Sequence, residues 1–347
     1  MKWETTDTKN IGFDFGLFGN HLNGNINYYI NETRDLLITR RIAPSAGLDN
    51  PTLNVGKMRN QGFELELNWN DKISDFEYNI GFNISTIANK VVALANEDQT
   101  IYGVGLKYGT EHFPTQTKVG KPIGAFYLYQ ADGIFQSLEE VQAHKNSKGE
   151  LLQPNAQPGD VRFKDMNGDG VIDEDDKTYS GTGIAKVEAN LNLGASYKGF
   201  DFSAVIGSAF GNKLYNGIRY YYEGMNSGSN FLKTTLNAWT PTNTKTDIPR
   251  AVFGDPNQNT RESTRFLENG DFVRLRQVQL GYTLPKALSK HIYCESIRFY
   301  VSAENVFTIT GYSGANPEFS QGVLNSGVDR FTYPFSRSYT VGAQVSF

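Results

Sequence analysis

The sequence has little of what enzymes and helical membrane anchors are built from. Of its 347 residues only Cys294 is a cysteine, so an intrachain disulfide and a cysteine metal cluster are both excluded. The four histidines are scattered, and there is no His-Glu-x-x-His, Gly-x-Ser-x-Gly or phosphate-loop motif. No apolar run approaches the ~18 residues of a transmembrane helix. Without a catalytic constellation, the chain is predicted not to be an enzyme.

The sequence also lacks a strong charge of either sign. Its formal net charge is −4, which indicates neither a nucleic-acid-binding surface nor a polybasic membrane anchor. The stretch after Met1 has no apolar core and no small-residue cleavage site, so no signal peptide is recognisable. If the protein is exported, its true amino terminus must lie upstream, and we therefore expect the chain to be a fragment.

What the sequence does contain is alternation. In residues 336–347 apolar and polar residues alternate, which predicts a strand with one apolar and one polar face. The apolar face consists of Tyr339, Val341, Ala343, Val345 and Phe347. About 9–11 residues suffice for a tilted strand to cross a bilayer. A final strand that ends on an aromatic residue resembles the last strand of bacterial outer-membrane barrels.

The composition agrees with a barrel. Hydrophobic residues make up 39% of the chain and aromatic residues 13%, and there are 35 glycines. A low apolar share suits a barrel because half of each strand faces water inside, while aromatic side chains gather at the two membrane interfaces.

Four hairpins repeat the alternation. Their predicted strands span residues 11–17 and 22–30, 63–69 and 76–84, 187–197 and 200–206, and 272–284 and 297–303. We expect turns at residues 18–21, 71–75 and 198–199, and a longer turn from Pro285. One face of the first hairpin is mostly asparagine, which suits a wet lumen better than a dry core. Together with the last strand, the sequence predicts about nine strands of an all-β, transmembrane antiparallel β-barrel.

Long polar segments alternate with the short turns. They span residues 30–60, 86–185, 211–270 and 306–335. Short turns at one end and long loops at the other are typical of the periplasmic and extracellular ends of an outer-membrane barrel. We therefore expect long extracellular loops and a periplasmic carboxy terminus. Arg274 and Arg276 share parity with Val278, so both are expected to point outward, above the lipid.

Residues 165–176 fit a calcium-binding loop. Oxygen-bearing side chains fall at positions 1, 3, 5, 9 and 12, with a backbone carbonyl at position 7 and Gly170 at the sharp turn. The predicted ligands are Asp165, Asn167, Asp169, Val171, Asp173 and Asp176. A strand-like stretch precedes the loop, and Asp replaces the usual Glu at position 12. We therefore expect a structural Ca²⁺ loop, similar to those of dockerins, and not a sensor EF-hand. The alternative is an acidic turn without metal.

A cluster of aromatic residues lies in the third long segment. It consists of Tyr220, Tyr221, Tyr222, Phe231 and Trp239. Tyr220, Tyr221, Tyr222 and Trp239 are candidate substrate-binding residues, because aromatic rings stack on sugars. The alternative, which base rates of burial favour, is that the cluster packs within the loop or against a partner.

Five stretches in order resemble a known family. They are residues 1–6 (MKWETT), 54–64 (NVGKMRNQGFE), 159–165 (GDVRFKD), 281–285 (GYTLP) and 302–307 (SAENVF). This ordered set resembles the carboxy-terminal portion of SusC/RagA-type TonB-linked outer-membrane proteins, over essentially all of residues 1–347.

The resemblance implies a TonB-dependent transporter with a barrel of about 22 strands closed by an amino-terminal plug. It also implies energy from the TonB complex, a SusD-like surface lipoprotein as a lid, and glycan or peptide cargo. The plug, the TonB-contacting segment and the earlier strands are not in this sequence, so the chain is expected to contribute wall and loops to an outer-membrane importer.

Two other interpretations stay open. The first is a calcium-braced barrel adhesin or surface-binding protein, which an upstream plug would exclude. The second is an outer-membrane hydrolase that uses carboxylates and histidines of the loops, against which the scattered histidines argue.

Overall fold

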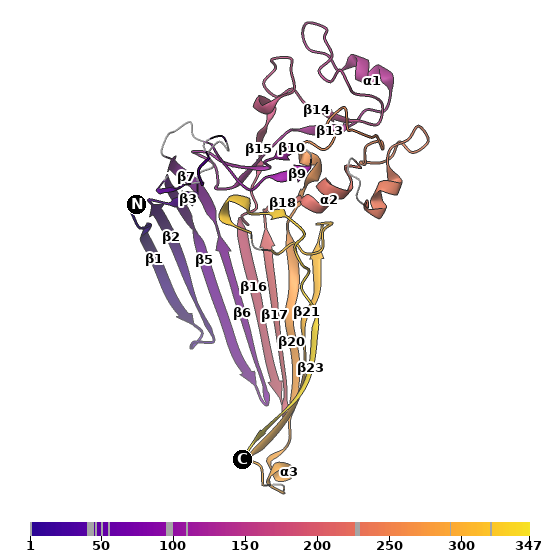
Figure 1. Ribbon diagram of the computed structural model, residues 1–347. Coiled ribbons are helices and arrows are strands. Elements are labelled where there is room, and N and C mark those ends of the chain that lie inside the picture. Colours follow the sequence, from indigo (N-terminus) through magenta and orange to yellow (C-terminus); the bar gives the residue numbers. More distant parts are fainter. Residues whose placement is uncertain are drawn as a thin grey trace.

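The computed structural model describes residues 2–39, 45, 47–49, 51–54, 56–94, 100–108, 110–225, 230–291, 293–319 and 321–347. Its largest element is a ten-stranded antiparallel sheet (Figure 1). Nine strands follow one another in chain order, and β7 (Ala88–Leu94) pairs with β5 off this path. The nine are β1 (Thr5–Leu17), β2 (Leu22–Arg34), β5 (Gly56–Ile73), β6 (Phe76–Thr86), β16 (Val187–Tyr197), β17 (Phe200–Phe210), β20 (Phe272–Thr283), β21 (Ser296–Thr310) and β23 (Ser338–Ser346). The nine predicted strands are thus confirmed.

The short turns lie together at one end of this sheet (Figure 1). Lys198 and Gly199 both have positive φ, 45° and 88°, as in the two-residue turns whose twist matches that of the flanking strands. The second turn is shorter than predicted because β5 continues to Ile73, which pairs with Phe76. The longer turn after β20 contains the short helix α3 (Lys286–His291).

Each strand keeps one apolar and one polar face in register with its neighbours. Leu193 pairs with Ile80 on the apolar face, and Asn190 pairs with Asn83 on the polar face. On the polar face Asn190 Nδ2 donates to Asn83 Oδ1 over 3.0 Å, whereas apolar side chains such as Val341 are 84% exposed. An exposed apolar face on a well-paired sheet is what lipid contact requires.

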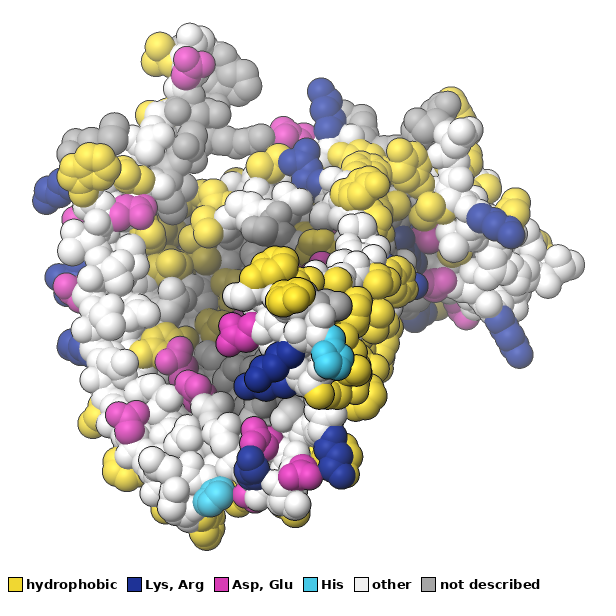
Figure 2. Space-filling view, turned by 90° about the horizontal axis from the view of Figure 1, so that it is seen from below, with side chains coloured by type: hydrophobic (Ala, Val, Ile, Leu, Met, Phe, Trp, Pro, Cys, Tyr) yellow, Lys and Arg dark blue, Asp and Glu magenta, His cyan; other side chains and the backbone are white. Residues whose placement is uncertain are grey.

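The sheet does not close on itself. Seen from below, it forms a curved wall around a hollow (Figure 2). β1 and β23 stand at the two ends of the strand order, and no pairing joins them among the described residues. The described strands are therefore one part of a barrel wall.

A β-bulge reverses the expected direction of two arginines. The register between β17 and β20 shifts at Arg276, which has no partner across the ladder. Beyond the bulge Leu275 pairs with Ile206 on the apolar face, and Arg274 pairs with Gly207 on the polar face. The prediction that Arg274 and Arg276 point outward is wrong, because counting parity fails where one strand carries an extra residue.

The predicted long segments fold above the sheet. We call the described residues of 100–185, 211–270 and 311–337 the loop region. Its strands are β8 (Ile101–Tyr102), β9 (Leu106–Tyr108), β10 (Thr110–His112), β11 (Thr115–Thr117), β12 (Ala125–Leu128), β13 (Ala131–Ile134), β14 (Val161–Phe163), β15 (Thr178–Gly181), β18 (Lys213–Asn216), β19 (Leu267–Asn269) and β22 (Val328–Asp329). β3 (Leu37–Thr39) and β4 (Thr52–Asn54) form a separate hairpin.

The helices of the loop region are short. They are α1 (Leu138–Ala143), α2 (Gly217–Tyr222) and the 3-10 turns η2 (Glu174–Asp176), η3 (Lys233–Asn237), η4 (Thr264–Phe266) and η5 (Val323–Asn325). No α-helix among the described residues is long and apolar enough to cross a membrane.

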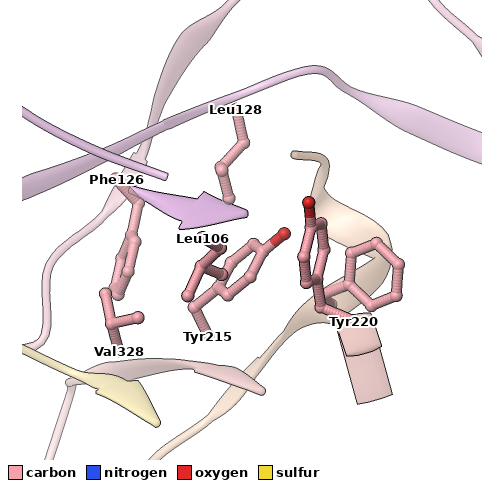
Figure 3. Packing of buried hydrophobic residues seen from close by; sticks show 7 residues of the cluster. Leu106, Phe126, Leu128, Tyr215, Tyr220 and Val328 are labelled. Carbon is pink, nitrogen blue, oxygen red and sulfur yellow. The ribbon is translucent and has the colours of Figure 1, made fainter. Parts of the chain in front are cut away.

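Most of the buried hydrophobic residues lie in the loop region, and a smaller cluster includes Val91 and Leu94 of β7. The main cluster takes residues from all three long segments (Figure 3), namely Leu106, Phe126, Leu128, Tyr215, Tyr220, Phe266 and Val328. The parallel pairing of β18 with β22 joins residues 311–337 to residues 211–270. The segments therefore form folded structure and not only connecting loops, which their polar composition did not reveal.

Candidate functional site

Two clefts of the loop region bring charged and aromatic side chains together. The larger, cleft A, has a volume of about 830 Å³, and its lining includes Tyr102, His112, Tyr129, Lys177, Arg261 and Glu262. The smaller, cleft B, has a volume of about 530 Å³, and its lining includes Asp132, Gln136, Glu140, Arg162, Asp247 and Arg265. Concave sites with a few convergent polar groups are the usual places where ligands bind.

A buried ion cluster forms the floor of cleft A. The Glu262 side chain is 3% exposed, and its two oxygens lie 2.5 Å from His112 Nδ1 and 2.5 Å from Lys177 Nζ. Burial alone would raise the pKa of Glu262, but the hydrogen bonds and charges of His112 and Lys177 outweigh it and lower the pKa to about 2. Glu262 therefore stays ionised at neutral pH.

Aromatic and cationic groups meet above this floor. The Arg261 guanidinium lies 4.9 Å from the ring centroid of Tyr129 and 4.6 Å from that of Phe163. Tyr102 and Phe113 also line the cleft, and their ring centroids are 5.2 Å apart. Cleft A thus offers flat apolar surfaces beside fixed charges, which suits a ligand that has both apolar faces and polar groups.

Cleft B lies between two arginine-containing walls. On one wall Asp132 binds Arg162 at 3.0 Å and Lys164 at 3.2 Å. On the other, Arg265 is buried and binds Glu223 at 2.9 Å. Burial lowers the pKa of Arg265 to about 10, despite the nearby Glu223 carboxylate, so Arg265 remains charged at neutral pH.

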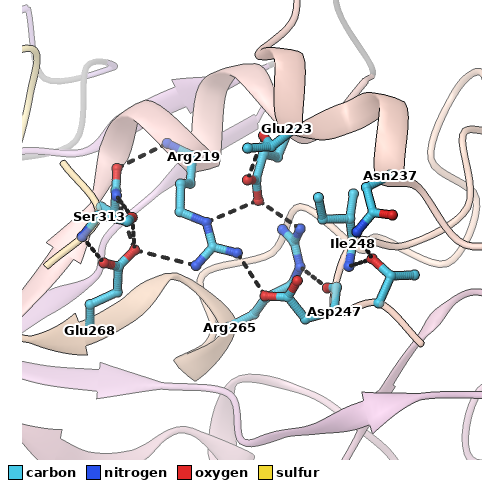
Figure 4. A network of polar contacts seen from close by, with 11 residues as sticks. Arg219, Glu223, Asn237, Asp247, Ile248, Arg265, Glu268 and Ser313 are labelled. Carbon is cyan, nitrogen blue, oxygen red and sulfur yellow. Dashed lines mark hydrogen bonds and ion pairs between the residues drawn. The ribbon is translucent and has the colours of Figure 1, made fainter. Parts of the chain in front are cut away.

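A second arginine extends this wall into a network (Figure 4). Arg219, on α2, binds Glu223 at 3.0 Å, Asp247 at 3.1 Å and Glu268 at 3.3 Å. Because Glu223 is shared by Arg219 and Arg265, the network holds α2 against the wall of cleft B.

A buried polar network between the clefts fixes their shared wall. Asp160 accepts two hydrogen bonds from Arg250, at 2.8 and 3.1 Å, and one from Asn259 Nδ2 at 2.9 Å. Asn259 Oδ1 in turn accepts from the backbone of Val161 at 2.9 Å. Sequence reasoning missed these residues, because their partners lie about a hundred positions away and no motif marks them.

The predicted calcium loop is a compact turn in the structure. Asp165 accepts hydrogen bonds from the backbone of Gly168 at 2.6 Å and of Gly170 at 2.9 Å. Asp176, which is buried, accepts from the backbone of Met166 at 2.6 Å and of Asp173 at 2.8 Å. The loop is therefore held in a closed shape by its own carboxylates.

The side chains of the described loop are not arranged as a preformed metal site. Among the described residues, no three His, Cys, Asp or Glu side chains gather as a ready cation site. The remaining predicted ligands, Asn167, Asp169, Val171 and Asp173, lie on the same turn, and their oxygens are the hard donors that Ca²⁺ prefers. The donor set therefore fits the ion by its chemistry.

The predicted aromatic cluster divides. Tyr220 is fully buried in the core cluster (Figure 3). Tyr221 and Tyr222 pack against Phe331, with ring centroids 5.4 and 5.6 Å apart. Trp239 is buried elsewhere, where its Nε1 donates to Gln136 Oε1 of cleft B over 2.9 Å. These contacts are packing contacts, and a substrate-binding role for the four residues stays a prediction.

The chain is similar to TonB-dependent receptors in sequence. Residues 1–306 match the family described as TonB dependent receptor-like, beta-barrel. TonB-dependent receptor P3 of Formosa agariphila is 30% identical, with the alignment covering 100% of this chain and 34% of that protein. TonB-dependent receptor SusC of Bacteroides thetaiotaomicron is 27% identical, covering 100% and 32%. The chain spans about a third of the length of these curated relatives.

The chain is also similar in fold to solved structures of outer-membrane transporters. A structure described as the RagAB peptide transporter has a TM-score of 0.79 and 26% identity, covering 100% of this chain and 36% of that one. An open-open state of the RagAB peptide importer gives a TM-score of 0.75. The resemblance to SusC/RagA-type proteins is confirmed, and these relatives are receptors and transporters. The chain belongs to the TonB dependent receptor-like β-barrel family of outer-membrane proteins.

Proposed function

We propose that the chain forms part of the wall and the outer mouth of a TonB-dependent nutrient importer. The observation that supports this most is the position of the two clefts. They lie in a folded region above a wall whose apolar face suits lipid and whose polar face suits a wet passage. Binding above the passage and release through it need no covalent chemistry.

In this proposal the loop region is extracellular and the short turns and carboxy terminus are periplasmic. Long structured loops at one end and tight turns at the other support this orientation. The energy would come from the TonB complex, acting through a part of the protein outside this sequence. A SusD-like surface lipoprotein would cover the loop region as a lid.

The cargo would be a glycan or a peptide. Aromatic faces beside charged groups in cleft A can stack on sugar rings or hold peptide side chains. The name of the RagAB peptide transporter favours peptide for that relative, and cleft A suits either class.

We also propose that residues 165–176 bind one structural Ca²⁺ through Asp165, Asn167, Asp169, Asp173, Asp176 and the Val171 carbonyl. The ion would brace the turn that carries Glu174, which lines cleft A. Extracellular calcium modules bind with Kd of about 10⁻⁴–10⁻³ M, so a weak site at the cell surface would be occupied.

The test of cargo binding uses the protein expressed from its whole gene. The purified protein is offered a protein digest and, separately, a mixture of oligosaccharides, and mass spectrometry identifies what is retained. Arg261→Gln should reduce retention, while Lys148→Gln, an exposed lysine outside both clefts, should not. Retention that is unchanged in Arg261→Gln would place the cargo outside cleft A.

A further inference from the structure

We propose that the turn containing α3 binds the anionic headgroups of phospholipids at the short-turn end of the sheet. Lys286 and Lys290 are four residues apart on α3, so they lie on the same face of the helix. Both are exposed, and neither forms an ion pair with another described residue. His291 follows directly and is exposed as well. This turn therefore carries two lysines that pair with no described carboxylate, and Glu295 is its one acidic side chain.

In the other short turns the lysines are paired with carboxylates. Lys198 lies 4.0 Å from Asp75 and 5.2 Å from the ring centroid of Tyr197. Lys72 is paired with Glu77. Their cations are already engaged by groups of this chain, so α3 is the place at this end where an anion from outside would find free charge.

The same turn exposes apolar side chains. Leu288 is 55% exposed and Tyr293 is 92% exposed. Ser289 of α3 is buried, and its carbonyl accepts from the Cys294 amide over 3.1 Å. A turn with exposed leucine, tyrosine and lysine has the composition of a membrane-interface anchor, in which apolar groups enter the acyl boundary and lysines reach the phosphates.

This turn continues the lipid-facing surface of the wall. Tyr282, close to the end of β20, packs on Phe200 with ring centroids 4.5 Å apart, and both belong to the apolar face. Phe299, near the start of β21, is 51% exposed on that face. Aromatic side chains at strand ends mark the membrane interface. Because α3 lies just beyond these ends (Figure 1), headgroups are the occupant that both charge and position favour.

The test measures which lipid touches the turn. Tyr293→Trp is introduced as a reporter in a Trp69→Phe background, in the protein expressed from its whole gene and placed in lipid bilayers. Because other tryptophans remain, the reporter's quenching is the difference from the same protein with Tyr293 retained. Bromine, which quenches tryptophan fluorescence, is carried either by phosphatidylglycerol alone or by phosphatidylcholine alone. We expect stronger quenching by brominated phosphatidylglycerol. A lysine near a charged surface enriches anionic lipid by a factor of about five, so Lys286→Gln with Lys290→Gln should abolish the preference.

Lys198→Gln is the matched control, since this lysine is at the same end but already paired, and it should keep the preference. Equal quenching by the two lipids, or a preference that survives the double substitution, would overturn the proposal. Absence of quenching by either lipid would place α3 away from the bilayer and overturn it too. The inference depends on the membrane-facing sheet and not on the cargo, so a negative transport result leaves it standing.

Discussion

Arg274 and Glu318 form an ion pair of 2.8 Å that joins the inner wall of the barrel to the last long segment. Arg276 binds the other oxygen of Glu318 at 2.9 Å. Arg274 also donates to Asn316 Oδ1 at 2.6 Å and is 3% exposed. The bulge at Arg276 makes this contact possible, because it turns both guanidinium groups to the polar face where the segment lies.

Substitution of Glu318 should loosen this segment. Glu318→Gln keeps the volume but removes the charge opposite a buried arginine, which costs about 1–3 kcal/mol. Hydrogen exchange of amides in residues 311–319 should speed up accordingly. Glu295→Gln, an exposed carboxylate at the opposite end, serves as the control. Unchanged exchange in Glu318→Gln would show that the ion pair does not hold the segment.

The two faces of the wall should respond oppositely to charge. Arginine on the apolar face would lie in lipid and cost about 2–4 kcal/mol of folding free energy near the bilayer centre, whereas arginine on the polar face would point into the lumen. The apolar-face set is Leu193, Ile80 and Val341, and the polar-face set is Asn192, Asn79 and Gln344. We expect the first set to lose folded protein in the outer membrane and the second to be tolerated. The assay is heat-modifiable mobility of each variant. Equal losses from both sets would contradict the barrel assignment.

The wall could be predicted from sequence because its signal is local. Leu191 and Leu193 alternate with Asn190 and Asn192. Because side chains alternate between the two faces of a strand, this pattern predicts the strand, the face that each residue occupies and the register of pairing. The same logic failed at Arg274, because an inserted bulge residue leaves no mark in the alternation.

The clefts could not be predicted because their residues meet only through the fold. Glu262 forms ion pairs with His112 and Lys177, which lie far from it in the sequence. Asp160 pairs with the equally distant Arg250. No periodicity or motif connects such positions. The calcium-like loop was visible in sequence because its donors are contiguous.

Calcium binding should depend on the loop carboxylates. Calorimetry on the parent protein should show one site with Kd of about 10⁻⁴–10⁻³ M. Asp165→Ala with Asp169→Ala should abolish the heat, and Asp175→Ala, in the same loop but outside the predicted ligand set, should retain it. Calcium binding that persists in the double variant would place the ion elsewhere. Absence of calcium binding by the parent protein would show that the loop is an acidic turn without metal.

Acid should weaken the loop region through Glu262. The pKa of this group is about 2 in the folded chain, against an ordinary value of 4.5. Its contribution is therefore complete above about pH 4.5 and is lost as the pH falls toward 2. Near neutral pH the shift corresponds to about 3 kcal/mol. Melting curves of Glu262→Gln should show lower stability at pH 7 and a flatter acid dependence than the parent. Parallel acid profiles would contradict this role.

The central claim is that the chain serves energised import, and uptake by living cells tests it most directly. Cells with the intact gene, cells without it and cells treated with an uncoupler are given the ligands retained by the purified protein, and their disappearance from the medium is measured. We predict uptake only in energised cells with the gene, and reduced uptake with Arg261→Gln. Ligand that is bound at the surface but never taken up would contradict the importer and favour an adhesin. Ligand that is taken up equally after uncoupling would contradict energised import and indicate passive entry.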